Sequence, residues 1–240
     1  MVQASMFARI LKWAGLGFLS FFILLCVSLL IALWPGIPAR VPLVKFHYQA
    51  AIDRYLCSSE GKSRILPSWH TELETKFSLL KDEWSNVGPK LLAETSKLIG
   101  TPFSHSEYDI PIFLCPSLPG IGFPIMIPIR MYLKNAVVEK PWDKSEFVDM
   151  VYHEILHLYI ARALHWNFWT PLLSKYRDEK LNTKIHLHLF AVQKAVYVNL
   201  GLRKQWKVVV TRNREFSSQY SRAIDIIEKE GYQPFIDELN

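Results

Sequence analysis

The longest stretch of the chain without a charged side chain lies close to its start. Residues 13–34 read WAGLGFLSFFILLCVSLLIALW. A helix rises about 1.5 Å per residue, so this stretch would span about 33 Å, enough to cross a hydrocarbon core of about 30 Å. A tryptophan at each end suits the two membrane interfaces, and no face of the helix is polar enough for the surface of a soluble domain. We therefore expect a single transmembrane helix.

Two properties favour a retained anchor over a cleaved signal peptide. The stretch is longer than a signal core of about 7–15 residues, and the nearest cleavage candidate, IPA at 37–39, has a bulky Ile where a small residue is needed.

The orientation of the helix depends on the positive charges on its two sides. Arg9 and Lys12 before the stretch nearly balance Arg40 and Lys45 after it, and the terminal amine adds one positive charge to the N-terminal side. We expect a membrane protein with one span, a cytoplasmic N-terminus and an exported domain.

The remaining residues divide around this anchor. Residues 1–12 form a short basic N-terminus, the three prolines of 35–45 predict a stiff linker, and 46–240 are long enough for one sizeable domain. Half of the whole chain is apolar, 13% is aromatic and 21% is charged, so the chain has enough apolar surface to fold.

Charge and cysteine content exclude several function classes. The net charge is +6 for the whole chain, and no dense run of Lys and Arg with interleaved aromatics occurs, so we expect no nucleic-acid partner. There is no CxxC pair, which excludes cysteine zinc sites and thioredoxin-like redox motifs. Cys26 lies in the apolar stretch, and Cys57 and Cys115 either form one disulfide or remain two buried thiols.

Hydrophobic periodicity predicts a mixed first half for the domain. Helical spacing recurs at 46–58 and at 68–87, with Ser68 as a cap, and a further helix at 89–99 follows the break at Gly88-Pro89. Strands are predicted at 109–115 and 123–133. Pro124 and Pro128 remove N–H donors from one edge of the second strand, which predicts an edge strand.

The second half is predicted to be mainly helical. A long helix at 144–164 begins with Asp143 and Glu146 in a capping-box arrangement, and a second helix occupies 183–199 and stops at Gly201. A short strand at 206–211 (WKVVVT) and a terminal helix at 214–231 complete the pattern. The predicted class is α+β, mostly α with a small sheet.

The stretch VYHEILHLY, in the middle of the long predicted helix, carries the chemistry. His153 and His157 are four residues apart, so their imidazoles lie on one helix face and can bind one metal ion. Glu154 is rotated away from the ligand position but is close enough to accept a proton from water on the metal. The competing interpretation is an ordinary helix whose two histidines bond to neighbouring groups.

This His-Glu-x-x-His motif, on a helix that follows a strand region and precedes a helix with further histidines, resembles the zincin class of metallopeptidases. The resemblance covers about 100 residues, and the motif is its specific element. It implies a zincin-like domain that binds Zn²⁺ through His153 and His157, uses Glu154 as general base and cleaves a peptide or protein substrate. Zincins also lay substrate along an edge strand, and 123–133 is in the right chain order for that role.

A third protein ligand is needed, and the sequence leaves its identity open. The metzincin position is Ala163, with His165 out of register, and the gluzincin candidate Glu179 lies in a charged segment. His186 and His188 point about 200° apart on the predicted helix, so at most one of them can face the metal. We favour His188 over His186, because His188 shares a face with small residues that allow close helix packing.

Two further aspects of the chemistry stay open. Candidates for the group that stabilises an oxyanion are Tyr197, Tyr176 and His165. The chain is predicted to be a membrane-anchored zinc metallopeptidase or amide hydrolase. The alternatives are a zincin-like binding or assembly module of the cell envelope without turnover, and an anchored helical domain without metal.

Overall fold

The computed structural model describes residues 41–59, 65–115, 121–122, 124–134, 141–167 and 169–240. All of them belong to one compact unit, Ala39–Asn240. The predicted anchor and the residues before it lie outside the described residues. Among the helices that are described, none combines the length and the apolar character needed to cross a membrane.

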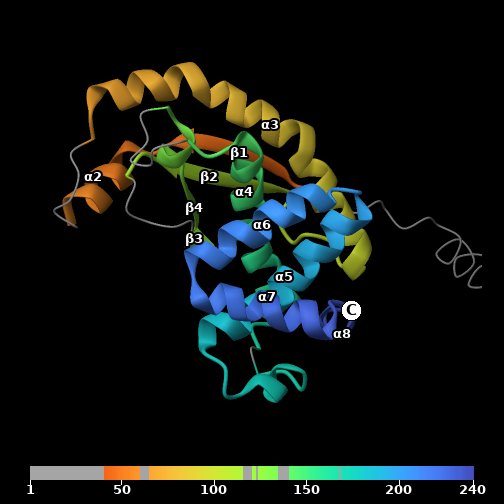
Figure 1. The fold of residues 1–240 in the computed structure, drawn as a ribbon. Helices are drawn as coiled ribbons and strands as arrows, with labels where there is room; N and C mark the ends of the chain where they lie inside the picture. Colours follow the sequence, from red (N-terminus) through yellow and green to blue (C-terminus); the bar gives the residue numbers. More distant parts are fainter. Residues whose placement is uncertain (1–40, 60–64, 116–120, 123, 135–140, 168) are drawn as a thin grey trace, which may run out of the picture. The chain divides into compact units, whose positions relative to one another are not determined.

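The described unit is mostly helical with a small sheet, as the sequence predicts (Figure 1). The sheet has the strand order β1-β2-β4-β3, with parallel pairing of β1 to β2 and of β2 to β4, and antiparallel pairing of β3 to β4. The strands are β1 (Leu43–Tyr48), β2 (Glu107–Phe113), β3 (Ile121–Gly122) and β4 (Ile125–Pro128).

Three predictions about the sheet are corrected. Residues 43–48 form β1, so the sheet begins inside the predicted linker, and the predicted helix at 46–58 is shortened to α2 (Ala50–Ser59). The strand predicted at 123–133 ends at Pro128, and a 3₁₀ turn, η1 (Arg130–Tyr132), replaces the rest. β4 is an inner strand, because β3 pairs with its outer side, so it does not provide the expected open edge for substrate.

The helix α3 (Pro67–Ile99) is continuous where the sequence predicts a break, and Figure 1 shows it as a long arc beside the sheet. Pro89 lies inside it and Gly88 packs against the ring of Trp84. Its N-cap is Leu66, and Ser68 makes no capping hydrogen bond there. The helix ends at Gly100, whose φ of +70° is accessible to glycine at low cost.

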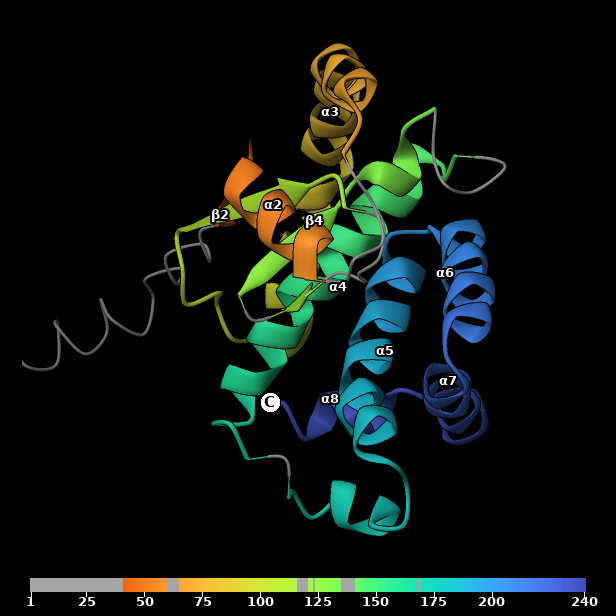
Figure 2. The ribbon, with the colours of Figure 1, turned by 90° about the vertical axis from the view of Figure 1, so that its left-hand side faces the viewer.

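The helix α4 (Lys144–Ala163) lies at the centre of the unit, with α3 and the sheet on one side and α5 and α6 on the other (Figure 2). Its predicted capping box is confirmed, since Asp143 accepts from the Ser145 N–H and Glu146 accepts from the Asp143 N–H. Tyr152 bonds to Thr95 of α3 at 2.6 Å, which fixes α4 against α3. Most of α4 is buried, including the polar side chains of Asp149, His153 and Glu154.

The chain after α4 is helical throughout its regular elements. The helix predicted at 183–199 is confirmed, but the predicted strand at 206–211 is wrong, because these residues belong to a helix whose Trp206 and Val209 are buried. Ser217 is extended and caps the next helix, so the predicted terminal helix is divided. The elements are η2 (Leu173–Tyr176), α5 (Leu181–Asn199), α6 (Arg203–Phe216), α7 (Ser218–Glu230) and α8 (Gln233–Asp237).

A disulfide and two hydrogen bonds join α2 to the segment at the end of β2. Cys57 and Cys115 are joined in a disulfide, with Cα atoms 5.7 Å apart, and pack with Phe113. Asp53 of α2 accepts hydrogen bonds from the N–H groups of Leu114 and Cys115 at 2.7 and 2.8 Å. These contacts hold α2 at the end of β2.

Candidate metal centre

Three histidines from two helices meet in the interior of the unit. His153 and His157 come from α4 and His186 from α5, and one nitrogen of each lies within 4.8 Å of the other two. His153 and His186 are buried and His157 is half-buried. A buried group of three neutral imidazoles can hold a metal ion.

The spacing of the first two histidines fits a shared ion. Their Nε2 atoms are 3.2 Å apart. Two nitrogens bound tetrahedrally to one zinc at about 2.0–2.1 Å would be about 3.3 Å apart. The two rings are therefore already at ligand separation.

The contacts of His186 determine which of its nitrogens faces the group. Nδ1 lies 2.7 Å from the carbonyl oxygen of Asn182, so Nδ1–H donates to it and Nε2 carries the lone pair. Nε2 is buried and has no hydrogen-bond partner among the described residues. A ligating histidine commonly donates its other ring N–H to a carbonyl in this way. The orphaned Nε2 is therefore oriented as a metal ligand would be.

Burial keeps the three imidazoles neutral. It lowers the pKa of His157 to about 4 and that of His186 to about 3, and it holds the pKa of His153 well below the ordinary value of 6.5. Neighbouring histidines lower the values for His153 and His186 further, and a hydrogen bond with Gln193 partly opposes this for His153. Neutral imidazole is the form that binds a metal.

Glu154 follows the first histidine and faces a small cavity beside the group. The cavity has a volume of about 70 Å³, and burial raises the pKa of Glu154 to about 8 in the metal-free protein. His153 and Tyr220 of α7 line the same cavity. The Tyr220 ring centre is 4.1 Å from that of His186, and burial together with Glu154 raises the pKa of Tyr220 to about 12. Its hydroxyl is therefore a proton donor at neutral pH.

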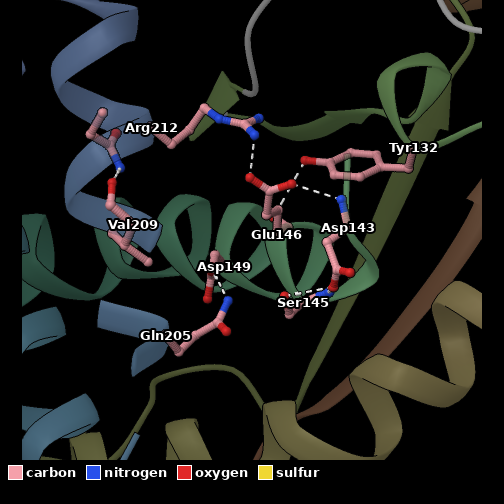
Figure 3. Close-up of polar contacts among 9 residues, drawn as sticks. Tyr132, Asp143, Ser145, Glu146, Asp149, Gln205, Val209 and Arg212 are labelled. Atoms are coloured by element: carbon pink, nitrogen blue, oxygen red, sulfur yellow. Dashed lines mark hydrogen bonds and ion pairs between the residues drawn. The ribbon is translucent and has the colours of Figure 1, made fainter. Parts of the chain in front are cut away.

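Polar contacts join α4 to α6 (Figure 3), and three of the residues involved, Glu146, Asp149 and Arg212, line this cavity. Arg212 reaches from α6 to the Glu146 carboxylate and lies over the Trp142 ring at 3.7 Å. Gln205 donates to Asp149 at 2.7 Å. These contacts hold α6 beside the cavity.

The other residues considered from sequence lie elsewhere. His188 bonds to Glu238 at 2.9 Å, so the structure brings His186, and not the favoured His188, to the pair. Glu179 pairs with Arg222 at 2.6 Å and His165 is exposed. Tyr197 bonds to Asp149 and Tyr176 to Glu230.

Sequence reasoning missed Tyr220 and Arg212. Each belongs to a helix with no motif of its own, and Arg212 and Tyr220 lie more than 50 residues from the motif. Helical spacing puts Gln193 on the same face of α5 as His186, which is the signal that identifies it as a neighbour of the group.

Comparison of the chain with protein-family models, with curated proteins and with solved structures finds no match. The chemistry of the site therefore rests on the residues themselves.

Proposed function

We propose that the chain is a membrane-anchored, zinc-dependent hydrolase of amide bonds, with peptides or proteins as substrates and a zincin-like catalytic domain. The observation that carries the proposal is the buried three-histidine group with Glu154 beside it on a cavity. Three imidazole nitrogens with an open fourth position form a donor set that suits catalytic zinc. We place the domain on the exported side of a membrane, held there by residues 13–34.

Each residue of the group has a role in this proposal. Bound zinc supplies a Lewis acid and lowers the pKa of a coordinated water towards 7. His153, His157 and His186 would hold the ion, and the Asn182 carbonyl fixes the tautomer of His186. Glu154 accepts the proton of the attacking water and passes it to the leaving nitrogen. Tyr220 donates a hydrogen bond to the oxyanion that forms on the substrate carbonyl.

A second candidate is a metal-stabilised module without turnover. The cavity beside Glu154 has a volume of about 70 Å³, which is small beside the roughly 300–1,000 Å³ of typical ligand pockets. In this alternative the metal joins α4 to α5, and Glu154 contributes nothing to function.

The first experiment measures metal content in the purified full chain and in H153A, H186A and H188A. We expect about one zinc per chain in the wild type and in H188A, and loss of the metal in the other two variants. A metal-free wild type that is folded, or equal loss in H186A and H188A, would contradict the proposed ligand set.

A second experiment separates catalysis from structural metal. The full chain and E154Q are incubated with a mixture of unfolded proteins, and new N-termini are counted by mass spectrometry. We expect E154Q to retain zinc and to lose at least about 100-fold in rate, as general bases contribute about 10²–10⁴. Equal cleavage by the two proteins would rule out Glu154 as the base. Zinc binding without cleavage by the wild type would favour the module.

A further inference from the structure

The connection between α4 and α5 exposes two tryptophans at one end of the described unit. It lies at the foot of both ribbon views (Figures 1 and 2). The exposed fractions are 53% for Trp166, 73% for Trp169 and 64% for Leu181, which follows at the start of α5. The other four described tryptophans are buried or half-buried: Trp69, Trp84, Trp142 and Trp206. We call Trp166, Trp169 and Leu181 the tryptophan patch.

The connection is held firmly by its other side. Leu173 is buried, and the Tyr176 ring stacks on Phe235 of α8 with ring centres 5.9 Å apart. Glu238 accepts from the Thr170 hydroxyl at 2.7 Å and from the Leu172 N–H at 2.9 Å. The segment therefore has an inner face that packs on the unit and an outer face that carries the patch.

The turn that presents the first tryptophan has an unusual backbone. His165 and Trp166 have φ values of +50° and +60°, which residues other than glycine rarely adopt. Hydrogen bonds from the Trp166 N–H to Ala161 and from the Asn167 N–H to Leu164, at 2.7 and 2.8 Å, hold this conformation. The exposed position of Trp166 thus belongs to a defined turn at the end of α4.

Basic side chains belong to the same connection and to the start of α5. Lys175, Arg177 and Lys180 are exposed, and the Lys184 ammonium lies 4.6 Å from the centre of the Trp169 ring. Residues 165–184 contain four basic and two acidic side chains; Glu179 pairs with Arg222 of α7, and Asp178 lies 3.9 Å from Arg177. The segment that carries the patch therefore has a net positive charge.

We propose that the tryptophan patch docks on the surface of an anionic lipid bilayer. Tryptophan rings prefer the interface between headgroups and acyl chains, and basic side chains beside them are attracted by anionic headgroups. Two exposed tryptophans in a segment of net positive charge, with the Lys184 ammonium against the Trp169 ring, match both requirements. The connection joins the two helices that carry the three histidines, so docking would fix how the metal centre faces the membrane. This inference does not depend on catalysis.

The test uses the full chain with W13F and W34F, which leaves six tryptophans. This protein is added to vesicles of equimolar phosphatidylcholine and phosphatidylglycerol, with and without bromine on the upper acyl chain. We expect brominated lipid to quench about a third of the emission, because two of the six tryptophans lie in the patch, and to quench almost none in W166S/W169S. Co-sedimentation measures attachment through residues 13–34 separately.

Two comparisons make the result specific. K175E/K180E should lose the quenching in the anionic vesicles while remaining folded by circular dichroism, and F216S, which removes an exposed aromatic from α6, should keep it. Equal quenching in the background protein and W166S/W169S would overturn the proposal, as would no quenching in either. The patch would then be a surface for a protein partner or for solvent.

Discussion

Asp149 is a buried carboxyl group on the helix that carries His153 and His157. Burial raises its pKa to about 7, and hydrogen bonds from Tyr197 and Gln205 only partly oppose this. In the unfolded chain the same carboxyl titrates near about 4. Between these values the folded protein holds a proton that the unfolded chain has lost, so the free energy of unfolding falls as pH rises through this window.

We expect D149N to remove that dependence. Asparagine keeps the shape of the side chain but cannot ionise, so the free energy of unfolding of D149N relative to wild type should rise by up to about 1.4 kcal/mol per pH unit between about pH 4 and 7. Urea denaturation in the presence of a chelator measures this. D178N is the matched control, since the Asp178 side chain is exposed. A difference that stays constant with pH would refute the raised pKa.

The ion pair between Glu72 and Arg130 is the most deeply buried one described. The atoms Oε2 and Nη2 are 3.0 Å apart, the Arg130 side chain is fully buried, and its guanidinium lies 4.7 Å from the centre of the Trp69 ring. Its Nε and Nη1 find no hydrogen-bond partner among the described residues. Loss of Glu72 would leave this cation without its counter-charge.

We expect E72Q to lower the free energy of unfolding by about 3–5 kcal/mol, because a buried charge is left uncompensated. E72Q/R130M should be more stable than E72Q, since the charge and its desolvation cost are both removed. K76M breaks the partly exposed pair of Lys76 with the same carboxylate and should cost less than about 1 kcal/mol. Chemical denaturation of the variants tests the order. A double variant less stable than E72Q would contradict the argument.

The two histidines of α5 mark the limit of sequence reasoning at this scale. The spacing of His153 and His157 is local, so the sequence alone places them together on α4. The choice between His186 and His188 depends on what covers each face of α5. His188 forms a hydrogen bond with Glu238, which lies directly after α8 and fifty residues later in the sequence. No periodicity within α5 predicts that contact.

At the scale of elements, α3 contains two adjacent residues, Gly88 and Pro89, that normally disfavour a helix. A Cβ on Gly88 would lie 2.4 Å from the buried ring of Trp84, so this glycine permits a close contact. Pro89 lacks the N–H that would bond to the carbonyl of Ser85. The two residues therefore have opposite effects: Gly88 is required by packing, whereas Pro89 costs a hydrogen bond.

We expect G88A to destabilise the protein by about 1–3 kcal/mol, because overpacking against Trp84 outweighs the better helix propensity of alanine. P89A should stabilise it by roughly 1 kcal/mol, because one helical hydrogen bond is restored. Thermal and urea denaturation of the two variants give the signs. Stabilisation by G88A would mean that the Trp84 ring is free to move.

The elements that the sequence predicts well have strong local signals. Asp143 and Glu146 form a capping box at the start of α4, and Gly201 follows the end of α5. The start of α4 and the end of α5 therefore follow from local chemistry. The errors occur where contacts distant in sequence decide. WKVVVT has the composition of a strand, but Trp206 and Val209 are three residues apart and pack together on one face of α6. α3 continues through Pro89 because its long packed face outweighs one lost hydrogen bond.

At the scale of the molecule, the three histidines connect two helices that are separated by the whole α4–α5 connection. A ligand that binds the folded state alone stabilises it by mass action, by about 2.7 kcal/mol at 100 times its dissociation constant. A zinc ion in this group would stabilise the contact between α4 and α5 in that way. The stabilisation should also resist acid, because burial lowers the pKa values of His157 and His186 to about 4 and 3.

We therefore expect a chelator to lower the melting temperature of the full chain by about 5–10 °C, and added zinc to restore it. E154Q should show the same shift, because Glu154 is not a ligand, whereas H153A and H186A should show none. The shift should persist at about pH 5.5, where histidines of ordinary pKa would already be protonated and release the ion. H188A is the matched control from the same helix and should behave like wild type. An equal shift in H186A, or its disappearance by about pH 6, would place the ion on more exposed histidines instead.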